Sequence, residues 1–197
     1  TVYFGGEFRA LPFEAAAPKV AVERFAQSAD GTIWMLYRNG ALRSFRQETA
    51  GPVIPPRGAQ IVGLETDSAG TVWVAYGDTV TRLVAGQDLS WTEGCPPPGL
   101  VRPRIVTARR GGIWVIDRDL LRRWHEGHWA EERRLDDRLN LGSQQVLETS
   151  TGLFLLGGVS VEGLRIVAAD GTMEPADVGA GNLSDWVRCL TEDAEGS

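Results

Sequence analysis

The chain has 197 residues, of which 43% are hydrophobic and seven are tryptophan, so it can bury a substantial core. Its formal net charge of −6 and its pI near 5.0 argue against nucleic acid as a partner, because nucleic-acid-binding proteins carry basic patches. No apolar run approaches the roughly 18 residues that a membrane span needs, so we expect membrane attachment only through segments outside this sequence.

The most informative pattern is a repeated step from a small or turn residue into an aromatic residue. The aromatic residues follow one another at intervals of 31, 39, 41 and 40 residues. They are Tyr3, Trp34, Trp73, Trp114 and Phe154, and the glycines of the pattern include Gly31, Gly70, Gly111 and Gly196. A period near 40 built from strands and turns indicates a repeat architecture. We predict repeats around residues 1–33, 34–72, 73–113, 114–153 and 154–197, with both ends cut within a repeat.

The repeat that contains Trp34 begins with an apolar run over residues 34–38. Asn39-Gly40 follows, which is the strongest short hairpin signal, and residues 41–45 return as a second strand. The next repeat has β-prone runs at 60–66, 71–76 and 80–84, separated by turns. Its middle run is apolar at nearly every position, which predicts a strand that is buried on both faces.

The repeat that contains Trp114 is predicted to form strands at residues 114–117, 120–124 and 128–131. Up to four antiparallel strands per unit, with a second strand buried on both faces, is typical of a propeller blade. The fold class is therefore all-β, a β-propeller fragment of about five blades. Trp34, Trp73, Trp114 and Phe154 should occupy equivalent positions between adjacent sheets. The fragment should form an open arc with apolar faces at its ends.

In the C-terminal stretch, a second recurring pattern is formed by Leu183, Ser184, Val187, Leu190, Asp193 and Gly196, and its second half is matched by Ser28, residues 30–34, Asp67 and residues 70–73. This pattern resembles the two-component regulator propeller repeat. The resemblance implies a sensor region, periplasmic or otherwise extracytoplasmic, of a bacterial histidine kinase, hybrid kinase or diguanylate cyclase. The implied partners are a small-molecule or oligosaccharide ligand, the remaining blades, a downstream signalling domain of the same chain, and a second copy in a receptor homodimer.

Catalytic chemistry has little support in the sequence. His125 and His128 are three residues apart across an expected turn, which favours exposed hairpin histidines over a metal site. Asp136 and Asp137 adjoin arginines and are better interpreted as solvated salt-bridge partners. Cys95 and Cys189 lie in different repeats without metal-ligand spacing. We predict no catalytic residues, metal or cofactor in this segment.

Ligands of propellers bind at the channel mouth or over the loops between blades. The candidate loops are 52–57, 96–104 and 179–186, and the candidate ligand-binding residues are Arg57, Arg102, Arg104, Asn182, Asp185 and Trp186. Trp186 could stack on a sugar face, or it could fill the gap between blades.

Two classes of function remain open. The favoured class is a non-catalytic sensor module that passes ligand binding to a signalling domain. The alternative is a propeller enzyme, a lyase or glycoside hydrolase, with its active site at the channel mouth. A protein-interaction propeller is a further possibility.

Overall fold

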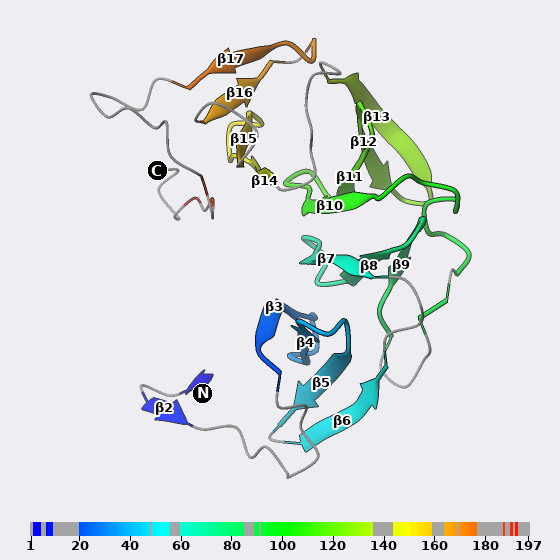
Figure 1. The fold of residues 1–197 in the computed structure, drawn as a ribbon, viewed down its shortest axis with the longest axis vertical. Coiled ribbons are helices and arrows are strands. Elements are labelled where there is room, and N and C mark those ends of the chain that lie inside the picture. The colour runs from blue at the N-terminus through cyan, green and yellow to red at the C-terminus, as the bar shows by residue number, and fades with distance from the viewer. Residues whose placement is uncertain are drawn as a thin grey trace.

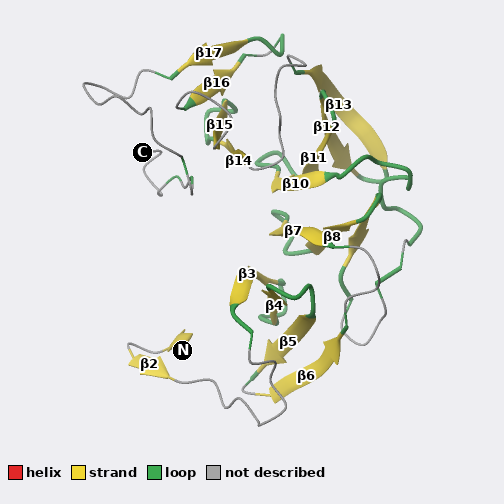
Figure 2. Cartoon of the chain, in the orientation of Figure 1, coloured by secondary structure: helices red, strands yellow, loops and turns green. Residues whose placement is uncertain are grey.

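The computed structural model describes residues 2–4, 7–9, 20–47, 49–55, 60–84, 89–90, 92–135, 144–158, 164–168, 170–176, 187, 190 and 192. For residues 2–4, 7–9, 144, 145 and 158 only the backbone is described. Within these ranges every regular element is a β-strand, and Figure 2 shows the strands joined by loops and turns. The described residues contain no helix long and apolar enough to cross a membrane.

The strands form five antiparallel sheets that follow one another around an open arc (Figure 1). The first two sheets are β1–β2 (Val2–Phe4, Glu7–Arg9) and β3–β6 (Val22–Gln27, Ile33–Tyr37, Leu42–Arg46, Thr49–Ile54). The third is β7–β9 (Ile61–Thr66, Val72–Tyr76, Thr79–Arg82). The fourth is β10–β13 (Arg104–Thr107, Ile113–Asp117, Leu120–His125, His128–Arg134), and the fifth is β14–β17 (Gln144–Glu148, Phe154–Gly158, Arg165–Val167, Met173–Pro175).

This arrangement confirms the predicted all-β propeller fragment of about five blades with up to four strands each. Strand order within every sheet follows chain order, and β3, β7, β10 and β14 lie on the inner side of the arc in Figure 1. The sheets that begin with β3, β7, β10 and β14 each start with the strand that precedes the repeated aromatic residue. A repeat counted from one aromatic residue to the next therefore contains strands of two sheets.

One turn recurs between the first and second strands of four sheets. In β7–β8, the Asp67 N–H donates to the Thr71 carbonyl at 2.9 Å, the Gly70 N–H donates to the Asp67 carbonyl at 2.9 Å, and Gly70 has φ +78°. The same pair of bonds and a glycine near φ +80 to +90° recur at residues 28–32, 108–112 and 149–153. The repeated glycine is therefore required by backbone conformation, as its position before the aromatic residue predicted.

The second strands are buried from both sides. Trp34, Trp73 and Trp114 are each the second residue of their strand and pack toward the sheet that follows. The first residue of such a strand, exemplified by Val72 and Ile113, packs toward the sheet that precedes. Two-sided burial explains why these strands are apolar at consecutive positions.

Phe154 departs from the expected equivalence. It is the first residue of β15, immediately after the recurring turn, so it corresponds to Ile113 and not to Trp114. Its ring faces back toward the preceding sheet and meets Trp114 edge-on, with ring centroids 4.9 Å apart. In this repeat the glycine and the aromatic residue are one position closer together. Because successive side chains of a strand point to opposite faces of the sheet, a shift of one residue places the aromatic ring on the other face.

The burial of a side chain on a first strand depends on whether the first strand of the preceding sheet covers it. Phe25, Leu64 and Ile105 each lie three residues before the recurring turn, on β3, β7 and β10. Leu64 and Ile105 are 2% and 5% exposed, whereas Phe25 is 65% exposed. β3 contacts β7 and β7 contacts β10, but the described residues before β3 provide only β1 and β2, with no first strand.

Substitution at two glycines should separate backbone strain from contact between sheets. Gly31 and Gly70 both have positive φ, but a Cβ at Gly31 meets nothing within 4 Å, whereas one at Gly70 lies 2.5 Å from the Ala29 Cβ and 2.7 Å from its Cα. We expect Gly31→Ala to lower the free energy of unfolding by about 1 kcal/mol and Gly70→Ala by a further 1–3 kcal/mol or so. Chemical denaturation measures both; equal losses would contradict the close contact at Ala29.

The exposure of Phe25 gives a second prediction. Leu64→Ala should lower the free energy of unfolding by about 2–5 kcal/mol because it opens a cavity between two sheets. Phe25→Ala should cost less than about 1 kcal/mol because most of its ring already contacts water. Urea unfolding of both variants provides the comparison, and a loss at Phe25 as large as that at Leu64 would show that the ring is covered in solution.

Candidate functional site

The four described first strands meet along the inner side of the arc. Consecutive members of the series β3, β7, β10 and β14 contact one another, so side chains from separate sheets converge there. Two hydrogen bonds of the same kind link the strands: the Thr66 hydroxyl donates to the Gln27 carbonyl at 3.1 Å, and the Thr107 hydroxyl donates to the Thr66 carbonyl at 2.8 Å. These equivalent bonds fix how the ends of the first strands lie against each other.

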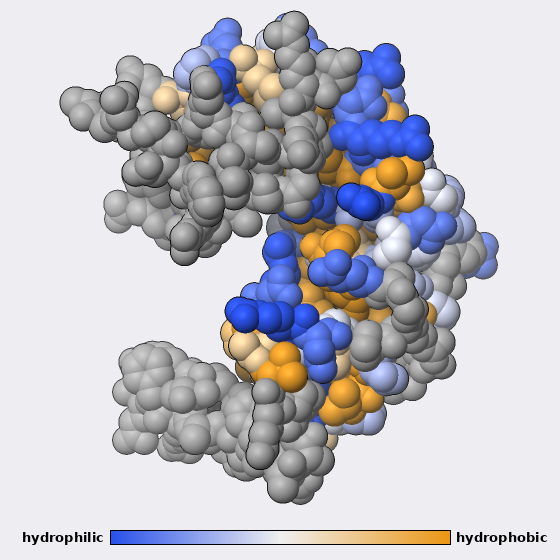
Figure 3. Space-filling view, in the orientation of Figure 1, coloured by the Kyte–Doolittle hydropathy of each residue, from blue (hydrophilic) through white to orange (hydrophobic). Residues whose placement is uncertain are grey.

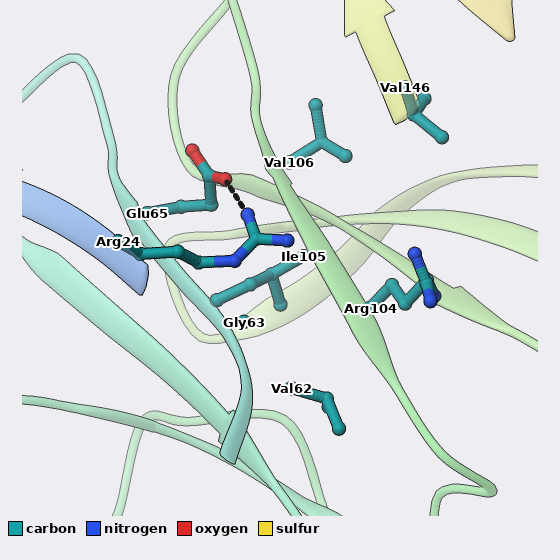
Figure 4. Close-up of a pocket in the computed structure, with 8 residues that line it drawn as sticks. All are labelled: Arg24, Val62, Gly63, Glu65, Arg104, Ile105, Val106 and Val146. Atoms are coloured by element: carbon teal, nitrogen blue, oxygen red, sulfur yellow. Dashed lines mark ion pairs between the residues drawn. The ribbon is translucent and has the colours of Figure 1, made fainter. Parts of the chain in front are cut away.

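A hollow opens where these strands meet. Figure 4 shows its lining, which comes from all four first strands. The lining residues are Arg24 of β3, Val62, Gly63 and Glu65 of β7, Arg104, Ile105 and Val106 of β10, and Val146 of β14. Figure 3 shows hydrophilic surface along the inner edge of the described part of the molecule.

Arg24, Gly63 and Arg104 occupy one equivalent position in three successive sheets, four residues before the recurring turn. Two guanidinium groups therefore border the hollow on either side of a glycine (Figure 4). A Cβ at Gly63 would lie 2.8 Å from Cγ1 of Ile105, which is too close for a side chain. The packing of β7 against β10 thus keeps the middle position small.

Among the described residues that line the hollow, Glu65 supplies the one carboxylate. It forms an ion pair with Arg24, with the nearest nitrogen and oxygen 3.7 Å apart, and its other oxygen lies 3.4 Å from the Thr107 hydroxyl. Burial raises the pKa of the Glu65 carboxyl above its ordinary value, although Arg24 and then Thr107 act in the opposite direction. Burial, and secondarily the charge of Arg24, lower the pKa of the Arg104 guanidinium, which nevertheless stays protonated at neutral pH.

A second carboxylate nearby has a structural role. Glu148, at the end of β14, is 2% exposed and accepts hydrogen bonds from Trp114 Nε1 at 2.7 Å and from the Arg109 N–H at 2.8 Å. Glu192 repeats the second contact one repeat later, where it accepts from the Ser150 N–H at 2.9 Å. Both carboxylates therefore link consecutive units and are not available for ligand chemistry.

The structure places only some of the predicted ligand-binding residues. Arg104 lines the hollow, whereas Arg102 is exposed in the loop before β10, with φ +51°. Arg57, Asn182, Asp185 and Trp186 lie outside the described residues, so their roles stay predictions. Tyr3 is described by its backbone alone, and Gly196 is not described.

Sequence reasoning missed Arg24 and Glu65. Their signal was present in the repeat register: once the turns are aligned, Arg24 and Arg104 fall at the same position. Glu65 lies two residues after Gly63 on β7, and both residues line the hollow. Inspection of loops alone could not find these residues, because both belong to first strands.

Other reactive side chains lie away from the hollow. His125 and His128 belong to the β12–β13 hairpin, and His125 lies 3.8 Å from the Glu126 carboxylate. Cys95 is buried, with its sulfur 3.2 Å from the Thr92 hydroxyl. Within the described ranges, no group of three or more histidine, cysteine, aspartate or glutamate side chains is arranged to hold a metal ion.

Comparison with known proteins identifies the fold of the chain. No known family profile matches the chain, and no curated protein matches it. Streptogramin B lyase is similar in structure with a TM-score of 0.62 at 13% identity, over 85% of this chain and 58% of the lyase. A catalytically inactive virginiamycin B lyase from Staphylococcus aureus with quinupristin gives 0.60 at 14% identity, over 86% and 60%. The chain has a β-propeller fold.

A third similar structure is the extracellular domain of a hybrid two-component system from B. thetaiotaomicron. It has a TM-score of 0.59 at 15% identity, and the match covers 89% of this chain and 25% of that one. The chain therefore spans less than two thirds of each of these propellers. At such low sequence identities the similarity establishes the arrangement of the sheets. It supports a propeller fold and does not identify the family.

The ion pair at the hollow gives a prediction with a definite sign. Arg24→Ala removes a cation that favours the charged form of Glu65, so the pKa of Glu65 should rise further. Because the folded-state pKa is raised, Glu65 contributes stability below its unfolded pKa that is lost as pH rises through the folded value. Carboxyl carbon chemical shifts measured by NMR across a pH titration report the change. Arg38→Ala, an exposed arginine in the β4–β5 turn, is the matched control and should leave Glu65 unchanged.

Proposed function

We propose that this chain is a non-catalytic, ligand-binding β-propeller module, the sensor region of a bacterial receptor of the two-component type. The observation that carries the proposal is the hollow on the inner side of the arc. Four separate sheets contribute to it, and its charged groups come from three of the first strands. Ligand sites in proteins are characteristically concave, with an apolar lining and a few convergent polar groups.

The signalling assignment has two independent supports. The repeats resemble the two-component regulator propeller pattern, with the glycine of each described copy in the required conformation. One of the similar solved structures is itself the extracellular domain of a hybrid two-component system. On the same grounds we propose an extracytoplasmic location, a downstream signalling domain in the full protein, and a receptor homodimer as the signalling unit.

The ligand class follows from the resemblance and from the lining. Some members of the resembled family recognise oligosaccharides, and the hollow offers both apolar side chains and hydrogen-bonding groups. Sugar rings present apolar CH faces rimmed by hydroxyls, so they suit such a mixed surface. We therefore propose an oligosaccharide as the ligand.

A propeller enzyme is the second candidate, because two of the similar structures are lyases. One of those lyases is inactivated by a histidine-to-alanine change. In this chain both histidines belong to the β12–β13 hairpin, on the third and fourth strands, whereas the hollow is lined by first strands. This separation favours binding over histidine-dependent chemistry at the hollow.

The purified chain should bind an oligosaccharide and release it unchanged. Calorimetric titration with an oligosaccharide panel measures binding, and chromatography after prolonged incubation detects cleavage. Val62→Trp, which fills part of the hollow, should weaken binding at least about tenfold, the effect of roughly 1.4 kcal/mol. Val84→Trp, at an exposed position outside the hollow, is the control and should bind normally.

Two outcomes would contradict the proposal. Cleavage products would favour the hypothesis that the chain is an enzyme. If the folded chain bound no oligosaccharide of the panel, the hypothesis that this segment senses an oligosaccharide would be wrong. Normal binding by a folded Val62→Trp variant would move the site away from the hollow and leave the sensor function in place.

A further inference from the structure

We propose that Arg24 and Glu65 together recognise two neighbouring hydroxyl groups of an uncharged sugar, with the guanidinium as donor and the carboxylate as acceptor. This inference rests on the proposed function and specifies its ligand: a neutral oligosaccharide that presents a vicinal diol. Three observations support it, namely the distance between the two groups, their partial exposure, and the surface beside them.

The two charged groups lie close together without a hydrogen bond between them. Nη1 of Arg24 and Oε1 of Glu65 are 3.7 Å apart, which is beyond hydrogen-bond distance (Figure 4). Oε2 of Glu65 lies 3.4 Å from the Thr107 hydroxyl, which is also longer than an ordinary O–H···O bond. The facing donor and acceptor atoms therefore keep capacity for further hydrogen bonds. A polar contact of this length suits a hydroxyl group that bridges the two partners.

Both groups can be reached from solvent. The side chain of Arg24 is 34% exposed and that of Glu65 is 30% exposed. They line the hollow from neighbouring sheets, Arg24 from β3 and Glu65 from β7. Hydrogen bonds to charged groups are stronger in such partly desolvated surroundings than on an open surface. A ligand that bonds to both groups would therefore gain affinity from each sheet.

The chemistry of the pair selects an uncharged polyol. A guanidinium offers only donors and a carboxylate offers only acceptors, whereas a hydroxyl both donates and accepts. Two adjacent sugar hydroxyls would therefore donate to Glu65 and accept from Arg24 at the same time. The formal charges of the pair cancel, so an anion meets repulsion from Glu65 and a cation meets repulsion from Arg24. A diol meets neither.

The surface next to the pair suits a sugar ring. Gly63 lies two residues before Glu65 on β7 and has no side chain to fill the space. Cγ1 of Ile105 comes within 2.8 Å of the place that a Cβ of Gly63 would take, so aliphatic surface lines this part of the hollow. Sugar rings have apolar CH faces rimmed by hydroxyls. A ring whose CH face lies on Ile105 would direct its rim toward the charged pair.

The first test compares ligands that differ in charge or in their hydroxyls. Calorimetric titration is carried out at about pH 8, well above the ordinary pKa of a glutamate. The neutral probes are cellotetraose, mannotetraose and galactotetraose. The tightest of them is compared with two derivatives, one with its primary hydroxyls oxidised to carboxylates and one with all its hydroxyls methylated. We expect the neutral probe to bind at least about tenfold more tightly than either derivative.

Variants of the pair assign the effect to these two residues. Arg24→Met removes the donors and should weaken binding of the neutral probe about tenfold or more. Glu65→Gln should weaken it severalfold, because the amide still accepts a hydrogen bond but has no charge. The double variant should lose less than the product of the two single effects, because both residues hold the same diol. Arg38→Ala and Glu126→Gln change the net charge equally at exposed turns and should leave affinity unchanged.

One result separates a binding role of the pair from a purely structural one. Glu65→Gln leaves Arg24 without an opposite charge, so this variant should bind the oxidised probe severalfold more tightly than the unaltered chain does, while it binds the neutral probe more weakly. Lost packing would weaken binding of both probes. Thermal melting verifies folding; if Arg24→Met does not fold, Glu65→Gln with the two probes still decides the matter.

The outcomes separate this inference from the sensor function. Equal binding of the neutral and oxidised probes, or unchanged affinity in the folded Arg24→Met and Glu65→Gln variants, would overturn recognition of a diol while the sensor function stands. Undiminished binding of the methylated probe would overturn it as well. Failure of every probe to bind would count against both proposals.

Discussion

The structure depends on one constraint: β4, β8 and β11, the second strands of three successive sheets, are apolar on both faces and must be covered by a sheet on either side. Trp73 is buried toward the following sheet and Val72 toward the preceding one, so no sheet in the middle of the arc is stable alone. Burial of such side chains contributes about 1.5–3 kcal/mol each, and each contribution exists only while the sheet that the side chain faces is present. The curvature of the arc follows from this stacking (Figure 1).

Stacking of the sheets also determines what lies on the inner side. The first strands approach closely enough for Thr107 to donate a hydrogen bond to the backbone of β7, and for Gly63 to leave no room for a Cβ beside Ile105. The side chains of Arg24 and Glu65 at this edge are only partly exposed, at 34% and 30%. Charged residues placed there, such as Arg24 and Glu65, therefore meet partners from adjacent sheets.

The same geometry connects fold and function. A hollow lined by several sheets changes shape when one sheet shifts against the next, because its walls belong to different sheets. A ligand bound in the hollow would stabilise one relative placement of the sheets that line it. Binding would in this way be coupled to the packing of the whole arc, which is a physical basis for passing a signal to an attached domain.

Several local features of the structure can be predicted from the sequence. The turn after β4 follows from Asn39-Gly40, the positive φ of Gly70 from its place before an aromatic residue, and the two-sided burial of β8 from its run of apolar residues. These are local properties, decided by backbone sterics and by the alternation of side chains along a strand. Arg104 was also identified, although as a loop residue and not as the start of a first strand.

Other features required the tertiary structure. Phe154 faces the preceding sheet because it is the first residue of its strand, one position nearer to the glycine of the turn than Trp114 is. A search for recurring aromatic residues does not detect this difference. The convergence of Arg24, Glu65 and Arg104 joins positions from three sheets, and nothing local to any one of them signals it. The sequence by itself determined the strands, the turns and the repeat, because these depend on neighbours along the chain. Only the stacking of sheets decided which charged residues share a site, because that depends on contacts between residues about 40 positions apart or more.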